Sequence, residues 1–429
     1  MNRVLPKAIH TSRRFALILL ATLVIAGSAG VATAGGVGDI IIPTREQAAN
    51  VNNDTVGVVF THEELFHQLV HDMEHELEPA SGLRIVPVMG KNHVQSVYDL
   101  LYLRGIDLAL LRADAIEYVK RKGNYPTIQR VVKSVAKVSQ EKVVLISRNE
   151  YASIEDLAGQ VVGFGLPGSG EYVTGTIVFD TLGIEPVPVQ VDNVQALKNV
   201  ASGELAAMMY LLREPDAVQT GLDLKASIAI SEIAATSDLH VIALPDADGL
   251  EQVYTPTNVS HDELPGLIEQ GREVASYSVD AILAAYQWRS TARRYEKSSR
   301  FVAAFAENLD GLRNDEYQPS WKRVDLATTT PNIRRLPLVE EELAKIEENR
   351  LARVEAERLA KQAEAERIAA EAEEARQREL KIAELARRRD ALTERLGEEL
   401  NEADAADLEA MLQQLDAFLK TRGVAPEPK

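Results

Sequence analysis

Residues 159–186 are the part of this sequence whose composition best suits ligand binding. An apolar run, Val161–Phe164, leads into Leu-Pro-Gly-Ser-Gly at residues 166–170, and a helix is expected to begin near Glu171. Glycines leave backbone N–H groups bare, and a helix start adds partial positive charge, so a carboxylate or phosphate could bind here. The alternative is an ordinary strand-to-helix turn. The residues expected to contact the anion are Gly168, Ser169 and Gly170.

Two arginines follow predicted strands and could select a charged ligand. Arg112 follows Asp107–Leu111, and Arg213 follows Ala206–Tyr210. A guanidinium can bind a carboxylate through two parallel hydrogen bonds. For each arginine the alternative is an ion pair with a nearby acid at the surface. The uncharged candidates are Asn92 and Tyr210, and Tyr210 could equally be a core residue.

A third candidate site is a run of histidines at residues 67, 71 and 75. This spacing places them on one face of a helix, one turn apart, where imidazoles can chelate Zn²⁺, Ni²⁺ or Cu²⁺. A dedicated metal site would need a further ligand, such as Glu78 or His62. The simpler interpretation, a solvated polar face made by His67, His71 and His75, is the one we favour.

Composition excludes several classes of function. The chain has 429 residues, 45% of them hydrophobic, which is enough for a large core. It has no cysteine, so disulfides, thiolate metal sites and cysteine nucleophiles are excluded. Its formal charge of −18 argues against a nucleic-acid partner. Since no catalytic motif emerges either, we expect neither an enzyme nor a cofactor.

The elements that position these residues alternate along the chain. Short β-branched runs predict strands, and amphipathic stretches between them predict helices, which together indicate α/β layers with mixed, mostly parallel sheets. The predicted strands are 55–60, 83–88, 107–111, 142–147, 160–164, 187–191, 206–210 and 240–244. The predicted helices are 63–77, 93–104, 114–122, 153–157, 172–182, 194–202 and 227–234.

An ordered series of segments resembles the solute-binding subunits of TRAP transporters of the TAXI type. Asp107–Asp114 looks like a strand and turn of that family. Ile154–Val162 looks like the family segment that leads into its next strand, and it is followed here by Gly165–Gly170 and Leu182–Ile184. Ala196–Glu204 followed by Ala207–Tyr210 is similar to a later family segment, and Tyr295–Val324 is similar to the closing helices. The resemblance covers roughly Thr55 to Leu336.

The resemblance implies a two-lobed type II periplasmic-binding-protein fold with a ligand cleft between the lobes. It implies lobe I at residues 55–150 and 240–322 and lobe II at 151–239, with linkers at 35–54 and 323–337. The sequence departs from the family at Thr61–Glu64, because the glycine-rich loop that usually follows the first strand is missing. This departure puts the family's usual ligand in doubt.

The first 34 residues resemble a signal peptide. Arg3, Lys7, Arg13 and Arg14 precede an apolar run, and Ala32 and Ala34 occupy the small-residue positions of a cleavage site. We expect cleavage after Ala34 and a periplasmic protein. An uncleaved membrane anchor is the alternative.

Composition changes near Pro337, after which Ala, Glu and Arg dominate. Residues 338–400 predict one long charged helix, either solvated and stabilised by its own ion pairs or forming a loose dimeric coiled coil. An amphipathic helix at 401–421 follows, and residues 422–429 are expected to be disordered. The apolar stripe of the helix at 401–421 could fold back on the long helix or contact a second copy of the chain.

Taken together, the sequence indicates an extracytoplasmic receptor for a small anionic organic solute, a carboxylate or an amino acid. As the resemblance implies, cleft closure would present the loaded receptor to membrane permease subunits of a TRAP transporter. The tail could add a homodimer contact or a helical partner. The alternative is an envelope adaptor or sensor that has lost transport and uses the fold and tail for protein–protein interaction.

Overall fold

A computed structural model describes residues 52–123, 125–213, 228–230, 232–233, 237–396 and 402–424. The expected signal peptide and most of the linker after it lie outside these residues, as do 425–429. Within the described ranges, no helix combines the length and the apolarity that crossing a membrane requires.

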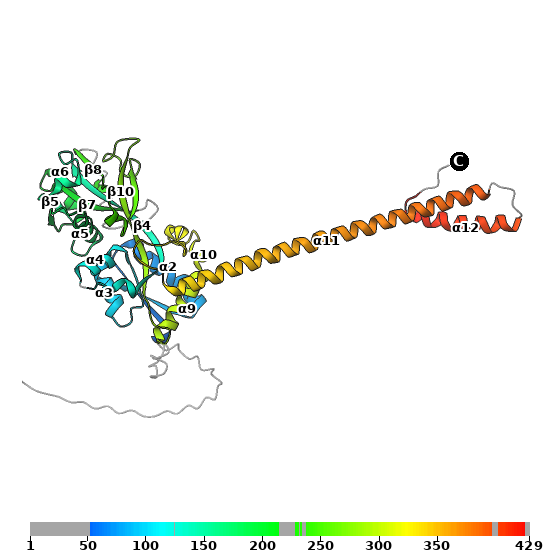
Figure 1. Cartoon of the computed structure of the whole chain (residues 1–429), viewed down its shortest axis with the longest axis horizontal. Helices are drawn as coiled ribbons and strands as arrows, with labels where there is room; N and C mark the ends of the chain where they lie inside the picture. The colour runs from blue at the N-terminus through cyan, green and yellow to red at the C-terminus, as the bar shows by residue number, and fades with distance from the viewer. Residues whose placement is uncertain are drawn as a thin grey trace, which may run out of the picture. The chain divides into compact units, whose positions relative to one another are not determined.

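The first lobe begins with three parallel strands that are covered by helices. Apolar β-branched runs form strands β1, β2 and β3, and amphipathic segments between them form helices whose apolar faces bury the sheet. The bounds are β1 Thr55–Phe60, α2 Glu64–Ser81, β2 Arg84–Met89, α3 His93–Tyr102, β3 Leu108–Arg112 and α4 Asp114–Lys122. Figure 1 shows α2, α3 and α4 grouped around this half of the sheet.

Two long antiparallel strands connect the lobes. Strand β4, Val132–Arg148, pairs with strand β10, Glu273–Tyr286, over most of its length. The first part of β4 packs in the core of the first lobe through Val135 and Val138, and its last part packs in the second lobe through Val143 and Leu145. The chain therefore crosses between the lobes inside the sheet.

The second lobe repeats the plan of the first. Strand β5 lies between β6 and β7 in parallel, and β4 pairs with β7 and β8 in antiparallel. The bounds are β5 Val161–Gly163, α5 Gly170–Leu182, β6 Val187–Val189, α6 Asn193–Ser202, β7 Ala207–Arg213, β8 Leu239–Ile242, α8 Asp248–Glu251 and β9 Thr255–Ser260. The predicted helix at 227–234 falls partly outside the described residues.

The strand order confirms the expected two-lobed fold class. In the first lobe the order is β2-β1-β3-β10-β4, and in the second it is β6-β5-β7-β4-β8, so each lobe receives its fourth strand from the crossing pair. Three strands of each lobe are parallel to one another, as predicted: β1, β2 and β3 in the first lobe and β5, β6 and β7 in the second. The central ones are antiparallel, because β4 and β10 run in opposite directions through both lobes.

Two segments lie in other parts of the fold than the sequence predicted. Residues 240–277 do not return to the first lobe: β8 pairs with the end of β4, and Leu244, Tyr254 and Tyr277 pack in the second lobe's core. The return occurs within β10, which pairs with β3 from Ala281 onward.

The stretch 323–337 is not a free linker. Val324, Leu326 and Leu336 are buried in the core of the first lobe, and Ser134 of β4 exchanges backbone hydrogen bonds with the segment just before Pro337. Helices α9 Arg293–Glu307 and α10 Leu309–Leu312 and the 3₁₀ helix Pro319–Arg323 precede it.

The long C-terminal helix confirms the prediction of an extended charged helix. Helix α11 spans Pro337–Leu396, and Leu338 and Val339 in its first turn are buried in the first lobe's core. Residues 344–381 are exposed on every side. Glutamate–arginine pairs one turn apart line this stretch, for example Glu347–Arg350 and Glu364–Arg367, as expected of a solvated helix.

The last helix, α12 at Glu402–Thr421, folds back on the end of α11. Figure 1 shows the two helices side by side there. Leu419 is buried, and Leu385 and Leu392 of α11 are half-buried. Of the two arrangements that the sequence left open for the apolar stripe, the structure therefore shows the fold-back within one chain.

Candidate functional site

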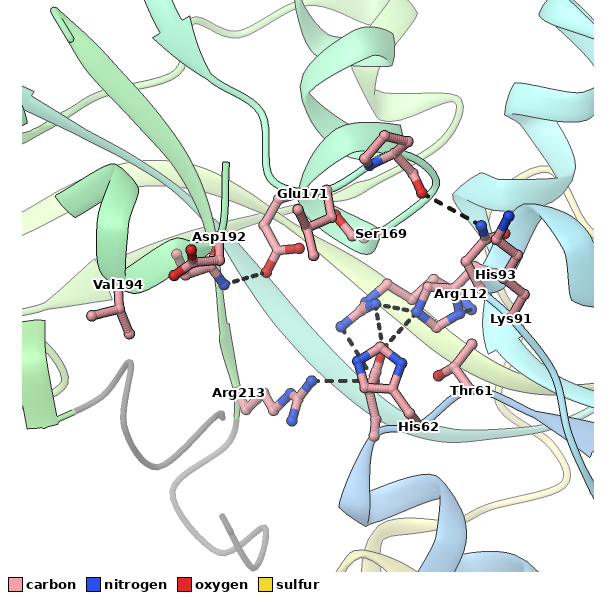
Figure 2. A pocket seen from close by; sticks show the side chains of 16 residues that line it. Thr61, His62, Lys91, His93, Arg112, Ser169, Glu171, Asp192, Val194 and Arg213 are labelled. Atoms are coloured by element: carbon pink, nitrogen blue, oxygen red, sulfur yellow. Dashed lines mark hydrogen bonds and ion pairs between the residues drawn. The ribbon is translucent and has the colours of Figure 1, made fainter. Parts of the chain in front are cut away.

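A cavity of about 250 Å³ lies between the two lobes, where four helices begin. Its lining comes from the loops before α2 and α3 in the first lobe and before α5 and α6 in the second (Figure 2). Each helix start carries partial positive charge, and its first N–H groups lack partners within the helix. Their convergence makes this cavity a candidate anion site.

Side chains at three of these helix starts serve as caps. Asn92 Oδ1 accepts from the backbone N–H of Gln95 at 2.8 Å, and Asp192 Oδ1 accepts from that of Gln195 at 3.1 Å. Ser169 Oγ accepts a longer bond, 3.3 Å, from the backbone N–H of Tyr172. Asn92 and Ser169, which the sequence predicted to bind ligand, therefore also fix two of the helices that surround the cavity.

Arg112 lies in the cavity wall but is already paired. Its Nε donates to Glu141 Oε2 at 2.5 Å, and its Nη1 donates to Glu63 Oε1 at 2.9 Å. Nη1 also contacts Nε2 of His93, which lies 2.7 Å from Glu63 Oε1. The guanidinium is buried, so it has no open edge for a ligand carboxylate.

Arg213 binds the same two acids from the opposite lobe. Its Nη2 lies 3.2 Å from Glu63 Oε2, and its Nε lies 3.2 Å from Glu141 Oε1. Figure 2 shows Arg112 and Arg213 directed toward one another, with dashed lines meeting between them. Two arginines and two glutamates thus form one charge-balanced cluster, which we call the Arg/Glu cluster: Glu63, Arg112, Glu141 and Arg213.

Two members of the cluster, Glu63 and Arg112, are held in their charged forms. Burial alone would raise the pKa of Glu63, but the charges of Arg112, His93 and Arg213 outweigh it and hold that pKa well below its usual range. Burial would lower the pKa of Arg112, but the carboxylates of Glu141 and Glu63 raise it well above its usual value. Because the charges cancel within the cluster, the two arginines leave no net positive charge for a ligand.

The remaining charges of the lining are mixed. Lys91 makes no ion pair within the described ranges, whereas Glu171 accepts from Asn193 Nδ2 at 2.9 Å and Asp192 caps α6. Figure 2 places Lys91 on the first-lobe side and Glu171 and Asp192 on the second-lobe side. The cavity therefore offers helix starts and one ammonium to an anionic group, and two carboxylates to a cationic one.

The glycines of the 166–170 loop make room for neighbouring side chains. A Cβ on Gly170 would lie 2.4 Å from Arg112 Nη1, and one on Gly168 would lie 2.5 Å from Asn92 Nδ2. Gly168 also has φ +79°, a left-handed conformation that other residues rarely adopt. Gly170 thus packs against the Arg/Glu cluster, while Gly168 packs against Asn92 of the other lobe.

The structure brings most of the predicted site residues together. Those that line the cavity are Asn92, Arg112, Ser169, Gly170 and Arg213. Gly168 is not among the lining residues, although it lies against Asn92. Tyr210 does not belong with them: it is 6% exposed and packs in the second lobe's core with Val144 and Leu197, because its β7 position faces the helices.

The histidine face is solvated, and no cluster of three potential metal ligands occurs among the described residues. His67, His71 and His75 are exposed. His71 lies 3.6 Å from Glu74, and His75 Nδ1 lies 2.8 Å from the hydroxyl of Tyr317.

Sequence reasoning missed the acids that neutralise the arginines. Glu63 sits in the glycine-free loop after β1, and Glu141 lies in β4 just before the part of that strand that was predicted, 142–147. The only available signal was the departure from the family pattern at Thr61–Glu64. A second buried contact was also missed: Asp114 Oδ2 of the first lobe accepts from Thr174 Oγ1 at 2.7 Å and from the Tyr254 hydroxyl at 3.2 Å.

Comparison with known proteins gives distant structural likeness only. No family model matches the chain, and no curated protein matches it. The periplasmic aliphatic sulphonate binding protein SsuA from Escherichia coli has 16% identity and a TM-score of 0.36, over 68% of this chain and 78% of that one.

Two further solved structures are similar at the same level. PhnD1 from Prochlorococcus marinus, in complex with methylphosphonate, has 12% identity and a TM-score of 0.36, over 63% of this chain and 88% of that one. A substrate-binding protein of an ABC uptake transporter from Streptococcus pneumoniae, with bound histidine, has 12% identity and a TM-score of 0.38, over 66% and 98%.

Proposed function

We propose that this protein is an exported receptor for a small organic solute, which it captures in the cavity between its lobes. The observation that carries the proposal is the convergence of four helix starts, two from each lobe, on one cavity. Such a site binds best when both lobes contact the same ligand. Ligand binding then favours the closed state, because only that state supplies all the contacts.

The charges around the cavity favour an amino acid over a simple carboxylate. A ligand carboxylate would bind at the helix starts and Lys91, and a ligand ammonium would bind near Glu171 and Asp192. The Arg/Glu cluster adds no net charge. The cavity volume of about 250 Å³ is large enough for a single amino acid.

The mode of action follows from the resemblance in the sequence. A closed, loaded receptor would dock on permease subunits of a TRAP-type transporter and release its solute there. Residues 1–34 would direct export to the periplasm, with cleavage after Ala34. The receptor itself would carry out no chemical reaction.

A ligand screen tests this proposal on the full mature chain. Thermal unfolding is measured with amino acids and with mono- and dicarboxylates, one at a time. A true ligand stabilises the protein by about 2.7 kcal/mol at a hundredfold excess over Kd. Lys91→Gln should weaken the response, whereas Lys198→Gln, an exposed lysine on α6, should not. A flat response across the whole panel would contradict the receptor function.

A second candidate function, an envelope adaptor or sensor, is favoured by the apolar residues along α11. Leu351, Val354 and Leu359 are each more than half exposed, although the helix around them is highly charged. A second copy of the chain or another helical protein could cover them. Light scattering on the full chain distinguishes a monomer from a dimer. A monomer that shows a flat ligand screen would leave the adaptor as the better proposal.

A further inference from the structure

A second cavity, of about 400 Å³, opens on the first lobe at the edge of the sheet opposite to the cleft. Thr55 at the start of β1 and Gly105 just before β3 line it, whereas the cleft lies beyond the other ends of these strands. The two cavities therefore share no residue.

Four cationic side chains line this second cavity, and none of its lining residues is acidic. They are Arg104, Arg293, Arg294 and Lys297. Asp and Glu outnumber Lys and Arg by 65 to 47 in this chain, so acids are available in excess to neutralise such a cluster. In the described part of the molecule only Asp107 pairs with any of the four. A strong positive potential therefore persists at this cavity.

Two of the cations are held in place by the fold. Lys297 Nζ lies 2.6 Å from Asp107 Oδ2 and donates to the Thr55 carbonyl at 2.7 Å. The Arg294 guanidinium stacks over the Trp288 ring at 4.9 Å, and its Nη1 donates to the Ile106 carbonyl at 3.3 Å. These contacts fix the cavity wall before any ligand arrives.

The rim of the cavity is fixed as well. An ion pair of 2.6 Å between Arg300 and Asp54 ties the segment before β1 to helix α9. Arg293 and Arg294 occupy the first turn of α9, whose cap residue, Ala292, offers no side-chain acceptor. The helix start therefore adds to the positive potential of the four side chains.

Arg104 and Arg293 are the cations that remain available to a ligand. Both are exposed, and neither has an ion pair or side-chain hydrogen bond among the described residues. Gly105 beside them has open space where a Cβ would be. Guanidinium groups bind phosphate oxygens in pairs, and a multiply charged phosphate matches this excess of positive charge better than a single carboxylate does.

We propose that this cavity is a binding site for a phosphate group. Arg104 and Arg293 would bind the phosphate oxygens directly, and Arg294 and Lys297 would act as fixed positive charges in the cavity wall. The phosphate group could belong to a free phosphate compound or to a phospholipid headgroup, which share this chemistry. The site is independent of the solute cleft, and the proposal does not depend on what the cleft binds.

The test uses the full mature chain and two probes. Binding of inorganic phosphate is measured by calorimetry, and binding to phosphatidylcholine vesicles with and without phosphatidic acid is measured by co-sedimentation. The double variant Arg104→Gln/Arg293→Gln should weaken binding by at least about tenfold, since it removes two charge-assisted contacts. The matched control, Arg130→Gln/Arg272→Gln, removes the same charge from exposed positions elsewhere.

Each outcome decides the proposal. Phosphate binding that the double variant loses and the control retains supports a soluble phosphate ligand. Binding only to vesicles with phosphatidic acid, lost in the same way, supports a headgroup. Absence of binding to both probes, or equal binding by the double variant and the control, would overturn the site.

Discussion

Glu63 of the first lobe lies 3.2 Å from Arg213 at the end of β7 in the second lobe. The contact joins the two walls of the cleft directly. It is part of a buried cluster in which every charge has a partner of opposite sign. Such a cluster tolerates the loss of one member poorly, because the partner charge is then left buried and unpaired.

We therefore predict that Glu63→Gln lowers the free energy of unfolding by about 3–5 kcal/mol at neutral pH. Chemical denaturation of the variant and the parent protein measures this difference. Glu204→Gln, at an exposed position, serves as the control and should stay within about 0.5 kcal/mol. A loss as small as the control's would mean that the cluster is not a structural requirement.

From the lowered pKa of Glu63 we predict that the stability of the protein depends on pH. The folded protein holds the pKa of Glu63 below the unfolded value of about 4.3, so the folded state binds its proton more weakly. The stabilisation from Glu63 is thus complete above that unfolded value and is lost as pH falls through the folded pKa. Unfolding measured over a series of acidic pH values should show the parent and Glu63→Gln converging. Curves that stay parallel on acidification would contradict this origin.

For the glycine-rich loop we predict that Gly170→Ala costs stability as well as ligand affinity. Its Cβ would lie 2.4 Å from Arg112 Nη1 and 2.7 Å from Leu211 Cδ1, and overpacking of this kind costs about 1–3 kcal/mol. Thermal unfolding without ligand is the decisive measurement. An unchanged melting temperature combined with weaker ligand binding would show instead that Gly170 faces the ligand.

The start of the tail yields a prediction about where the chain can be shortened. A protein ending at Pro337 lacks Leu338 and Val339, whose side chains are buried in the first lobe, whereas one ending at Glu348 keeps both. The shorter protein should be less stable by about 3–6 kcal/mol, since burial of each of these two side chains contributes about 1.5–3 kcal/mol. Equal stability of the two proteins would mean that the first turn of α11 is dispensable.

The local pattern of the chain was sufficient to predict the outer elements. Strand β1 and helix α4 were predicted with their observed bounds, because each has a clear apolar period and clear ends. The two strands that cross between the lobes, β4 and β10, were not predicted with their observed bounds. The segment Glu273–Tyr286 mixes alanine, serine and isolated aromatics, and its buried positions follow from contact with both lobes rather than from alternation.

At the candidate site, strand ends identified where Arg112 and Arg213 lie but not what they bind. Glu63 is 49 positions from Arg112 and Glu141 is 72 positions from Arg213, so no local pattern reports these pairs. Of the two alternatives that the sequence left open for each arginine, a carboxylate clamp or an ion pair with a nearby acid, the structure shows the ion pair, although it is buried and not at the surface. Only the three-dimensional arrangement shows that their charge is already neutralised.

The attachment of α11 has a mechanical consequence. Its first turn is embedded in the core of the first lobe, and the residues just before it are hydrogen-bonded to Ser134 of β4, the strand that passes from one lobe to the other. A force applied to the far end of α11 is therefore transmitted to the first lobe through a rigid attachment, because no flexible linker separates the helix from that lobe. The load enters the molecule at a strand that runs through both lobes.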